Sequence, residues 1–101
     1  MKVWWVMEIE TFKDEMKRKE YYEFLDTWGP MWQKKHEGVK YKYLGGWSDN
    51  PGCVMYVNEY ESMEEFSKVW SDEELQKELL KLRNLCESFI LRIMRPTVTV
   101  R

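Results

Sequence analysis

The chain has too few metal-binding side chains for a structural metal site. Its 101 residues include one histidine and two cysteines, Cys53 and Cys86, whereas a structural zinc ion takes about four Cys or His ligands at short spacing. The sequence also contains no glycine-rich phosphate loop and no nucleophile elbow. We therefore expect no metal and no cofactor, and no catalytic motif identifies a reaction.

The chain also lacks an excess of one charge and a long hydrophobic run. Its 16 basic and 18 acidic residues leave a net charge of −2, which gives no electrostatic reason to expect nucleic acid or an anionic membrane as partner. No stretch is apolar for long enough to span a bilayer. The opening "MKVWWVMEIE" reaches Glu8 and Glu10 too soon for a signal peptide. A cytoplasmic protein is the expectation.

Large apolar side chains are plentiful instead. Aromatic residues make up 16% of the chain and include six tryptophans, so one domain over residues 1–101 has material for one core. Period-two alternation, which is typical of strands with one buried face, occurs in four segments. These predicted strands are residues 3–10, 39–47, 53–60 and 89–95.

Two helical stretches separate these strands. Tyr21, Leu25, Trp28 and Trp32 recur at helical spacing within residues 13–36. Gly29-Pro30 interrupts this stretch, because proline removes a helix hydrogen bond and clashes with the preceding turn. We expect a kink there, or a stop at Trp28 with a second short helix opening at Pro30.

The second stretch, residues 63–88, contains two helix-start signals. "SMEE" at 62–65 is a capping box with Ser62 as N-cap and Glu65 at N3, and "SDEE" at 71–74 repeats the signal. We predict two segments, 63–70 and 73–88. The element order is then that of the ferredoxin-like split βαβ fold (βαββαβ), an α+β class, with a four-stranded antiparallel sheet and helices on one face. The first and third strands are expected side by side and parallel to each other.

Alternation assigns the strand residues to two faces. The residues expected to face the helices are all apolar or aromatic: Val3, Trp5, Met7, Ile9, Val39, Tyr41, Tyr43, Cys53, Met55, Val57, Phe89, Leu91 and Ile93. The opposite face mixes charges with large apolar groups: Trp4, Val6, Glu8, Lys40, Lys42, Leu44, Val54, Tyr56, Asn58, Tyr60, Ile90, Arg92 and Met94. Gly45 and Gly46 are expected to allow a β-bulge in the second strand.

The apolar residues of the helix-free face predict a homodimer. Exposing them forfeits roughly 1.5–3 kcal/mol for each large aliphatic side chain that could be buried, and a second identical sheet would cover them. The expected interface residues are Trp4, Glu8, Lys42, Trp47, Tyr56, Asn58 and Arg92. Glu8 and Arg92 have matching parity on adjacent strands, and we interpret them as an ion pair that satisfies charge at the interface.

The stretch "YLGGWSDNPGCVMYVNEYESMEEFSKVW", residues 43–70, reads as a strand, a glycine-containing hairpin, a strand ending in "EYES", and a helix. With this pattern the chain resembles the dimeric α+β barrel superfamily over about residues 3–95. The resemblance implies that the hairpin reaches over the partner subunit, so that Trp47 covers the other chain. The alternative is that Trp47 folds back onto its own third strand. The tail "RPTVTVR", 95–101, is a candidate extra strand.

The resemblance also implies that a ligand lies between the sheet and the helices of one protomer. The pocket residues expected there are Trp5, Trp28, Trp32, Tyr41, Tyr43, Phe66 and Trp70. An aromatic cavity suits a planar or apolar ligand, although these residues would equally well fill the core. The first strand lacks the Asn of the superfamily's heme degraders and residues 63–88 lack their His. "TWGPMW" at 27–32 lacks the His of rhamnose mutarotases.

Candidates for acid–base chemistry are few. His36, in "KKHEG", is either a general base or a favourable helix C-terminal residue, and we interpret it as the latter. Tyr41 and Tyr43 are the other weak catalytic candidates. Cys53 and Cys86 are expected to point into the same layer, either as a disulfide or as two free thiols, and a cytoplasmic location favours free thiols.

Three functions remain open. The preferred one is a homodimeric barrel that binds a small apolar or aromatic molecule. The first alternative is a cofactor-independent monooxygenase or an isomerase or mutarotase-like enzyme. The second is a non-enzymatic sensor or assembly module. An acid–base group in the aromatic pocket would favour the enzyme.

Overall fold

A computed structural model describes residues 1–47 and 52–95, without the side chain of Trp47. The elements are β1 (Val3–Thr11), α1 (Glu15–Lys35), β2 (Tyr41–Trp47), β3 (Cys53–Tyr60), α2 (Met63–Trp70), α3 (Glu73–Asn84) and β4 (Cys86–Met94). This is the predicted ferredoxin-like order, with the second helical stretch divided in two. The predicted strand at 95–101 and the prediction for the Trp47 side chain lie outside the described residues.

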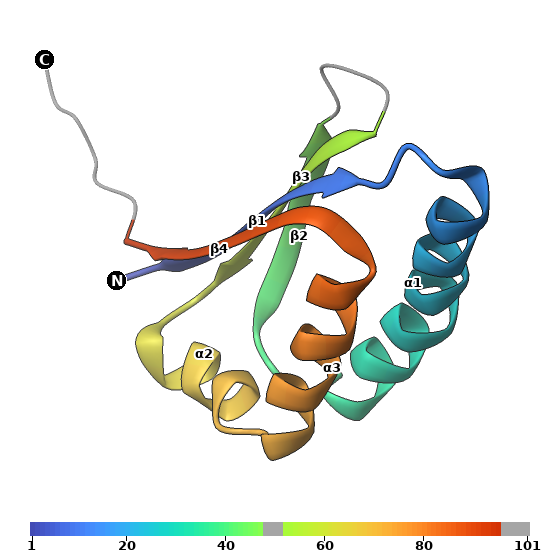
Figure 1. Cartoon of the computed structure of the whole chain (residues 1–101). Helices are drawn as coiled ribbons and strands as arrows, with labels where there is room; N and C mark the ends of the chain where they lie inside the picture. Colours follow the sequence, from blue (N-terminus) through green and yellow to red (C-terminus); the bar gives the residue numbers. More distant parts are fainter. Residues whose placement is uncertain (48–51, 96–101) are drawn as a thin grey trace, which may run out of the picture.

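The strands form one antiparallel sheet in the order β2-β3-β1-β4. All the helices lie on the same side of it (Figure 1). β1 and β3 are neighbours as predicted, but they run antiparallel, so the parallel pairing expected from the sequence is wrong. The reason is topological: the hairpin between β2 and β3 reverses the chain, while the α1 crossover leaves β1 and β2 pointing the same way.

The pairing register decides which residues share a face, because directly opposed residues point to the same side of a sheet. Odd-numbered β1 residues belong to the core, and Trp5 is only 3% exposed. Trp5 pairs with Asn58, Met7 with Tyr56, and Val3 with Tyr60. Asn58, Tyr56 and Tyr60 therefore face the helices, and their predicted place on the helix-free face is wrong.

Three further β3 residues also lie on the face opposite to the predicted one. Val57 pairs with Val6, Met55 with Glu8, and Cys53 with Glu10. Cys53, Met55 and Val57 thus lie on the helix-free face, and not under the helices as predicted. The parity of "CVMYVNEY" is ambiguous because both of its alternating sets contain large apolar residues.

The two edge strands, β2 and β4, follow the prediction. In β4, Phe89, Leu91 and Ile93 pair with Ile9, Met7 and Trp5 and share their face. In β2, Tyr41 and Tyr43 pair with Tyr60 and Asn58 on the helix side. The register shifts between Tyr43 and Gly45, which confirms the predicted bulge.

Helix α1 is continuous from Glu15 to Lys35, with Pro30 inside it. The expected stop at Trp28 is therefore wrong. Proline removes one backbone donor, but the helix is held on the sheet by the large side chains on its inner side. Tyr21 on that side is fully buried, and Phe24, Leu25, Trp28 and Trp32 pack against the core.

The two later helices begin at side-chain caps. The Ser62 hydroxyl accepts a hydrogen bond from the Glu65 amide at 3.1 Å, which confirms Ser62 as the N-cap, while the Glu65 carboxylate accepts from the Lys40 amide at 3.2 Å. Asp72 caps α3 by accepting from the Glu74 amide at 3.0 Å. α3 ends at Asn84 and β4 starts at Cys86, so the predicted helix was too long and the predicted strand too short.

The two cysteines are free and lie in different layers. Cys86 is buried in the core, where its thiol donates to the Leu82 carbonyl at 3.1 Å, and burial raises its pKa to about 11. Cys53 lies on the helix-free face opposite Glu10. The predicted shared layer is wrong, because it followed from the wrong parity of β3. Among the described residues no helix is long and apolar enough to cross a membrane.

Candidate ligand pocket and helix-free face

A small cavity of about 100 Å³ lies between the sheet and α1. β1 contributes Trp5 and Met7, β3 contributes Asn58 and Tyr60, and α1 contributes the indoles that close the opposite side. The residues that line it are Trp5, Met7, Trp28, Trp32, Gln33, His36, Tyr41, Asn58, Tyr60 and Val69. The structure therefore brings together four of the seven predicted pocket residues, namely Trp5, Trp28, Trp32 and Tyr41.

The other three predicted pocket residues do not line the cavity. Phe66 and Trp70, from α2, stack on each other at 5.5 Å and meet Trp5 edge-on, with centroid distances of 6.4 and 6.0 Å. Their packing against the Trp5 indole restricts the orientation of that ring. Tyr43 is 55% exposed and lies outside the cavity.

A ladder of aromatic rings along α1 forms the helix wall of the cavity. Trp28 lies 5.6 Å from Phe24 and 5.7 Å from Trp32, and Trp32 lies 4.1 Å from the His36 imidazole. The spacing of about four residues places these rings on one side of the helix. The wall is consequently apolar, with a polar end at His36.

His36 ends α1 and also reaches the cavity. It is the C-cap of the helix, which confirms the helix-terminal role preferred from the sequence. Its Nδ1 lies 3.3 Å from the Trp32 carbonyl oxygen and its Nε2 lies 3.1 Å from the Asp72 carboxylate. Both ring nitrogens are therefore engaged by structural partners, and the imidazole joins α1 to the start of α3.

Asp72 is the centre of this junction. The Lys35 ammonium, 2.8 Å away, holds the pKa of the Asp72 carboxyl below its usual value, with further support from the Glu74 amide. The burial of Tyr60 raises its phenol pKa, so that hydroxyl is neutral in the cavity wall at ordinary pH. Tyr21, whose hydroxyl lies 3.4 Å from that of Tyr56, has its pKa raised for the same reason.

Asn58, Gln33 and Tyr60 are pocket residues that the sequence analysis missed. Asn58 was assigned to the helix-free face because β3 was read with the wrong parity. Antiparallel pairing of β1 with β3 would have placed Asn58 beside Trp5. Gln33 follows Trp32 on α1 and carries no sequence signal of its own.

The helix-free face combines ion pairs with apolar side chains. The predicted Glu8–Arg92 pair is present at 2.6 Å. The Glu59 carboxylate accepts from the Trp4 indole at 2.7 Å and from Lys2 at 3.1 Å, and these bonds lower its pKa. Lys42 lies 3.7 Å from the same carboxylate. Four of the predicted interface residues therefore lie on this face: Trp4, Glu8, Lys42 and Arg92.

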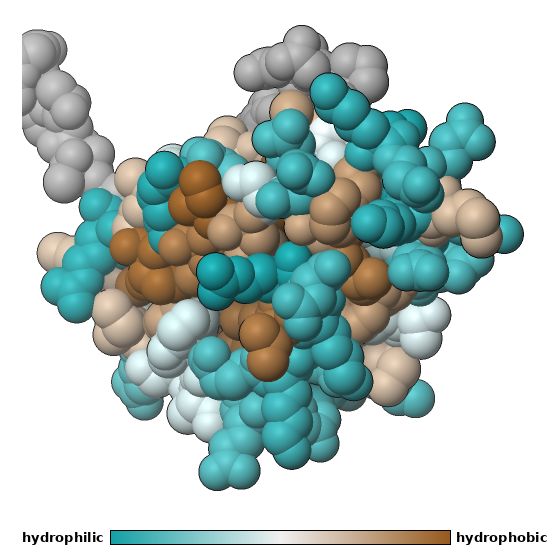
Figure 2. Space-filling view, in the orientation of Figure 1, coloured by the Kyte–Doolittle hydropathy of each residue, from teal (hydrophilic) through white to brown (hydrophobic). Residues whose placement is uncertain are grey.

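Apolar surface remains exposed beside these pairs. Ile90 and Met94, which share the helix-free face through their pairing with Glu8 and Trp4, are 42% and 45% exposed. Figure 2 shows hydrophobic residues gathered over β4 and β1, interrupted by hydrophilic groups. Tyr56 and Asn58, by contrast, point toward the helices and are not available to an interface on this face.

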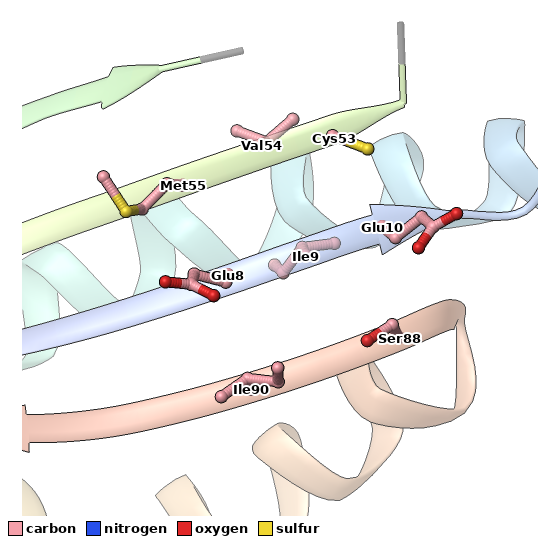
Figure 3. Close-up of a pocket in the computed structure, with 8 residues that line it drawn as sticks. All are labelled: Glu8, Ile9, Glu10, Cys53, Val54, Met55, Ser88 and Ile90. Carbon is pink, nitrogen blue, oxygen red and sulfur yellow. The ribbon is translucent and has the colours of Figure 1, made fainter. Parts of the chain in front are cut away.

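An open groove of about 670 Å³ crosses one end of this face. Side chains from β1, β3 and β4 line it, and the helices lie behind the three strands (Figure 3). The lining residues are Glu8, Ile9, Glu10, Cys53, Val54, Met55, Ser88 and Ile90. Among the residues described, no group of three or more His, Cys, Asp or Glu side chains is placed to hold a metal ion.

Comparison with known proteins identifies the fold. No family model matches the chain, and no curated protein matches it. Among solved structures, a dimeric ferredoxin-like protein from an uncultured marine organism is 16% identical, with 99% of this chain and 92% of that chain covered and a TM-score of 0.69. SnoaB, a cofactor-independent oxygenase from Streptomyces nogalater, is 13% identical, with coverages of 98% and 96% and a TM-score of 0.65.

A NIPSNAP family protein from Agrobacterium tumefaciens is 23% identical, with 95% of this chain and 86% of that chain covered and a TM-score of 0.60. One of these structures is described as a dimeric ferredoxin-like protein, and the present chain shares the fold of all three. The resemblance inferred from residues 43–70 is thereby confirmed at the level of the fold. At these identities the likeness carries no activity across.

Proposed function

We propose that this protein binds a small apolar or aromatic molecule in the cavity between its sheet and α1. The observation that carries the proposal is the lining: three tryptophans and two tyrosines around about 100 Å³, with only a few polar groups. Small-molecule sites are typically apolar clefts with a few placed polar groups. The cavity is smaller than the apolar cavity of about 150 Å³ that holds a benzene molecule, so the ligand is no larger than one ring and the cavity walls would have to move slightly to admit it.

The geometry favours binding over catalysis. An enzyme of the oxygenase or isomerase type would need a free acid–base group beside the ligand. His36 reaches the cavity, but the Trp32 carbonyl and the Asp72 carboxylate engage both of its nitrogens. Tyr41, the other catalytic candidate that lines the cavity, is the residue on which an enzymatic function would depend. A binding or sensor module is therefore the function we propose, with cofactor-independent oxygen chemistry, as named for SnoaB, as the alternative.

Toluene is a suitable probe because it is a single apolar ring. Titration of the protein with toluene should change the tryptophan emission in a saturable way, since three indoles line the cavity. In Trp28→Phe the emission change should shrink. In Trp4→Phe, the matched control on the helix-free face, it should persist. An emission change that rises linearly with toluene concentration would contradict binding at this cavity. So would an emission change that is reduced equally in Trp28→Phe and Trp4→Phe.

We further propose that the helix-free face is the interface of a homodimer. The exposed apolar side chains of Ile90 and Met94 support it, and so does the description of one structural neighbour as dimeric. The groove of Figure 3 would then lie between the two sheets. Trp4, Glu8, Lys42 and Arg92 are the interface residues we propose among those described. Trp47, whose side chain lies outside the described residues, stays a prediction.

A further inference from the structure

Two indole N–H groups in the core have no hydrogen-bond acceptor among the described residues. They are Nε1 of Trp5 and Nε1 of Trp28, and both atoms are buried. The indole of Trp4, on the other face, donates to Glu59 at 2.7 Å. A buried donor without an acceptor is costly and uncommon in native structures. These two atoms therefore indicate where an acceptor atom would be stabilised.

Both unpaired donors belong to side chains that line the same cavity. Trp5 enters it from β1 and Trp28 from α1, on opposite sides. Asn58, directly opposite Trp5 in the sheet register, adds an amide group to the wall. The other walls are largely aromatic, as described above. The cavity, which we call the chamber, is thus largely apolar, and two of the side chains in its wall carry unpaired neutral donors, a pattern that suits a ring with one acceptor oxygen.

The charge of the chamber limits the ligand further. No lysine or arginine is among the residues that line the cavity. His36 is the one side chain there that can carry positive charge, and it already faces the Asp72 carboxylate. Burial keeps the Tyr60 phenol neutral. A carboxylate or phosphate placed there would lack a cation of its own, and burying an unpaired charge is strongly unfavourable.

An entry route is present on the outer side of α1. A groove of about 270 Å³ between α1 and α3 is lined in part by Trp28 and Trp32, which also line the cavity. These two rings therefore separate the chamber from the surface. Met31, at the groove, is 65% exposed. Rotation of the partly exposed Trp28 or Trp32 ring would connect the groove with the chamber.

We propose that the chamber selects a neutral carbonyl compound of about one ring, whose oxygen accepts hydrogen bonds from the Trp5 and Trp28 indoles. This inference rests on the proposed binding function and adds the chemical class of the ligand. The carbonyl oxygen has two lone pairs and accepts two donors. A hydrocarbon of equal shape would fill the same space and leave both donors unpaired.

Cyclohexanone and methylenecyclohexane test the proposal as a matched pair. They have nearly the same size and shape, and only cyclohexanone carries an acceptor oxygen. Each is titrated into the ¹⁵N-labelled full chain, and the indole N–H resonances of the six tryptophans are followed. Trp5→Phe and Trp28→Phe assign the two relevant resonances, and Trp4→Phe assigns a control. Trp28 is only partly buried, so Trp28→Phe is the variant expected to fold without difficulty.

With cyclohexanone, the Trp5 and Trp28 indole protons should move downfield and the Trp4 proton should not. The affinity for cyclohexanone should exceed that for methylenecyclohexane by about tenfold, in keeping with one satisfied pair of buried donors, and Trp28→Phe should reduce this ratio. Equal affinities with shifts at Trp5 and Trp28 would overturn the carbonyl inference and leave the binding function standing. No shift with either probe would overturn both.

Discussion

At the scale of single residues, Asp72 connects more of the molecule than any feature of its sequence indicates. It caps α3, binds Lys35 at 2.8 Å and meets the His36 imidazole at 3.1 Å. Its three partners come from the end of α1 and the start of α3. The position of the cavity wall at His36 therefore depends on one carboxylate.

The pH dependence of stability should reveal this role. The folded-state pKa of Asp72 lies below the ordinary value of an aspartate, chiefly through the Lys35 hydrogen bond. A lowered pKa means that the contribution of Asp72 is present above the unfolded-state pKa and is lost as pH falls through the folded-state value. Urea unfolding from about pH 7 down to about pH 3 should show this loss, and Asp72→Asn should lose less on acidification than the parent.

Two substitutions of Asp72 separate the contribution of its helix cap to stability from the contribution of its negative charge. Asparagine is also a good N-cap, so Asp72→Asn should retain the cap, whereas Asp72→Ala should cost about 1 kcal/mol more through loss of the cap. Identical acid sensitivity in the parent and Asp72→Asn would show that other carboxylates, such as Glu59, dominate.

At the scale of elements, two glycines occupy contrasting positions. Gly29 lies inside α1 directly before Pro30, and a Cβ built there meets no atom within 4 Å apart from its chain neighbours and the backbone of the same helix. Gly52 precedes β3 with φ at +89°, and a Cβ there would lie 2.9 Å from the Thr11 hydroxyl. The Gly52 carbonyl accepts from the Thr11 amide at 2.7 Å, which ties this turn to the end of β1. One glycine is therefore replaceable and the other is required.

Gly29→Ala should stabilise the protein by less than the about 0.5–1 kcal/mol gained at an ordinary helix position, because the ring of Pro30 disfavours the helical conformation for a preceding residue that has a Cβ. Gly52→Ala should destabilise it by about 1 kcal/mol or more, because alanine is strained at positive φ. Thermal and urea unfolding of the two variants against the parent measures both effects. A destabilising Gly29→Ala would mean that α1 needs flexibility next to Pro30.

At the scale of the whole molecule, the two faces of the sheet differ in the side chains that they carry. The helix-covered face contains the core and the proposed ligand chamber, and the opposite face carries ion pairs among exposed apolar groups. The proposed dimer would bury the second face without touching the chamber. Ligand binding and assembly should accordingly be separable by mutation.

Ile90→Lys and Leu80→Lys form a matched pair for this test. Both side chains are exposed, by 42% and 58%, but Ile90 lies on the helix-free face and Leu80 on α3. Light scattering at micromolar concentration should give twice the chain mass for the parent and for Leu80→Lys. Ile90→Lys should weaken the dimer by roughly 2 kcal/mol or more if Ile90 is a central contact. A monomeric parent would refute the proposed interface.

The sequence alone determined the order of the elements and the faces of three of the four strands, β1, β2 and β4. In β1, Glu8 and Glu10 interrupt the even positions while Val3, Trp5, Met7 and Ile9 are all apolar, so the parity is unambiguous. The Ser62 N-cap divided the second helical region for a similar reason, since capping is a local interaction. The His36 cap and the β2 bulge likewise follow from neighbouring residues.

Only the tertiary structure decided what depends on pairing. The parity of β3 is not encoded in "CVMYVNEY", because apolar residues occupy both of its faces, and the antiparallel register with β1 settled it. That register placed Asn58 beside Trp5 in the cavity and moved Cys53 away from Cys86. The continuity of α1 through Pro30 was decided in the same way. Packing of the Tyr21, Trp28 and Trp32 side chains against the sheet outweighed the loss of one backbone hydrogen bond.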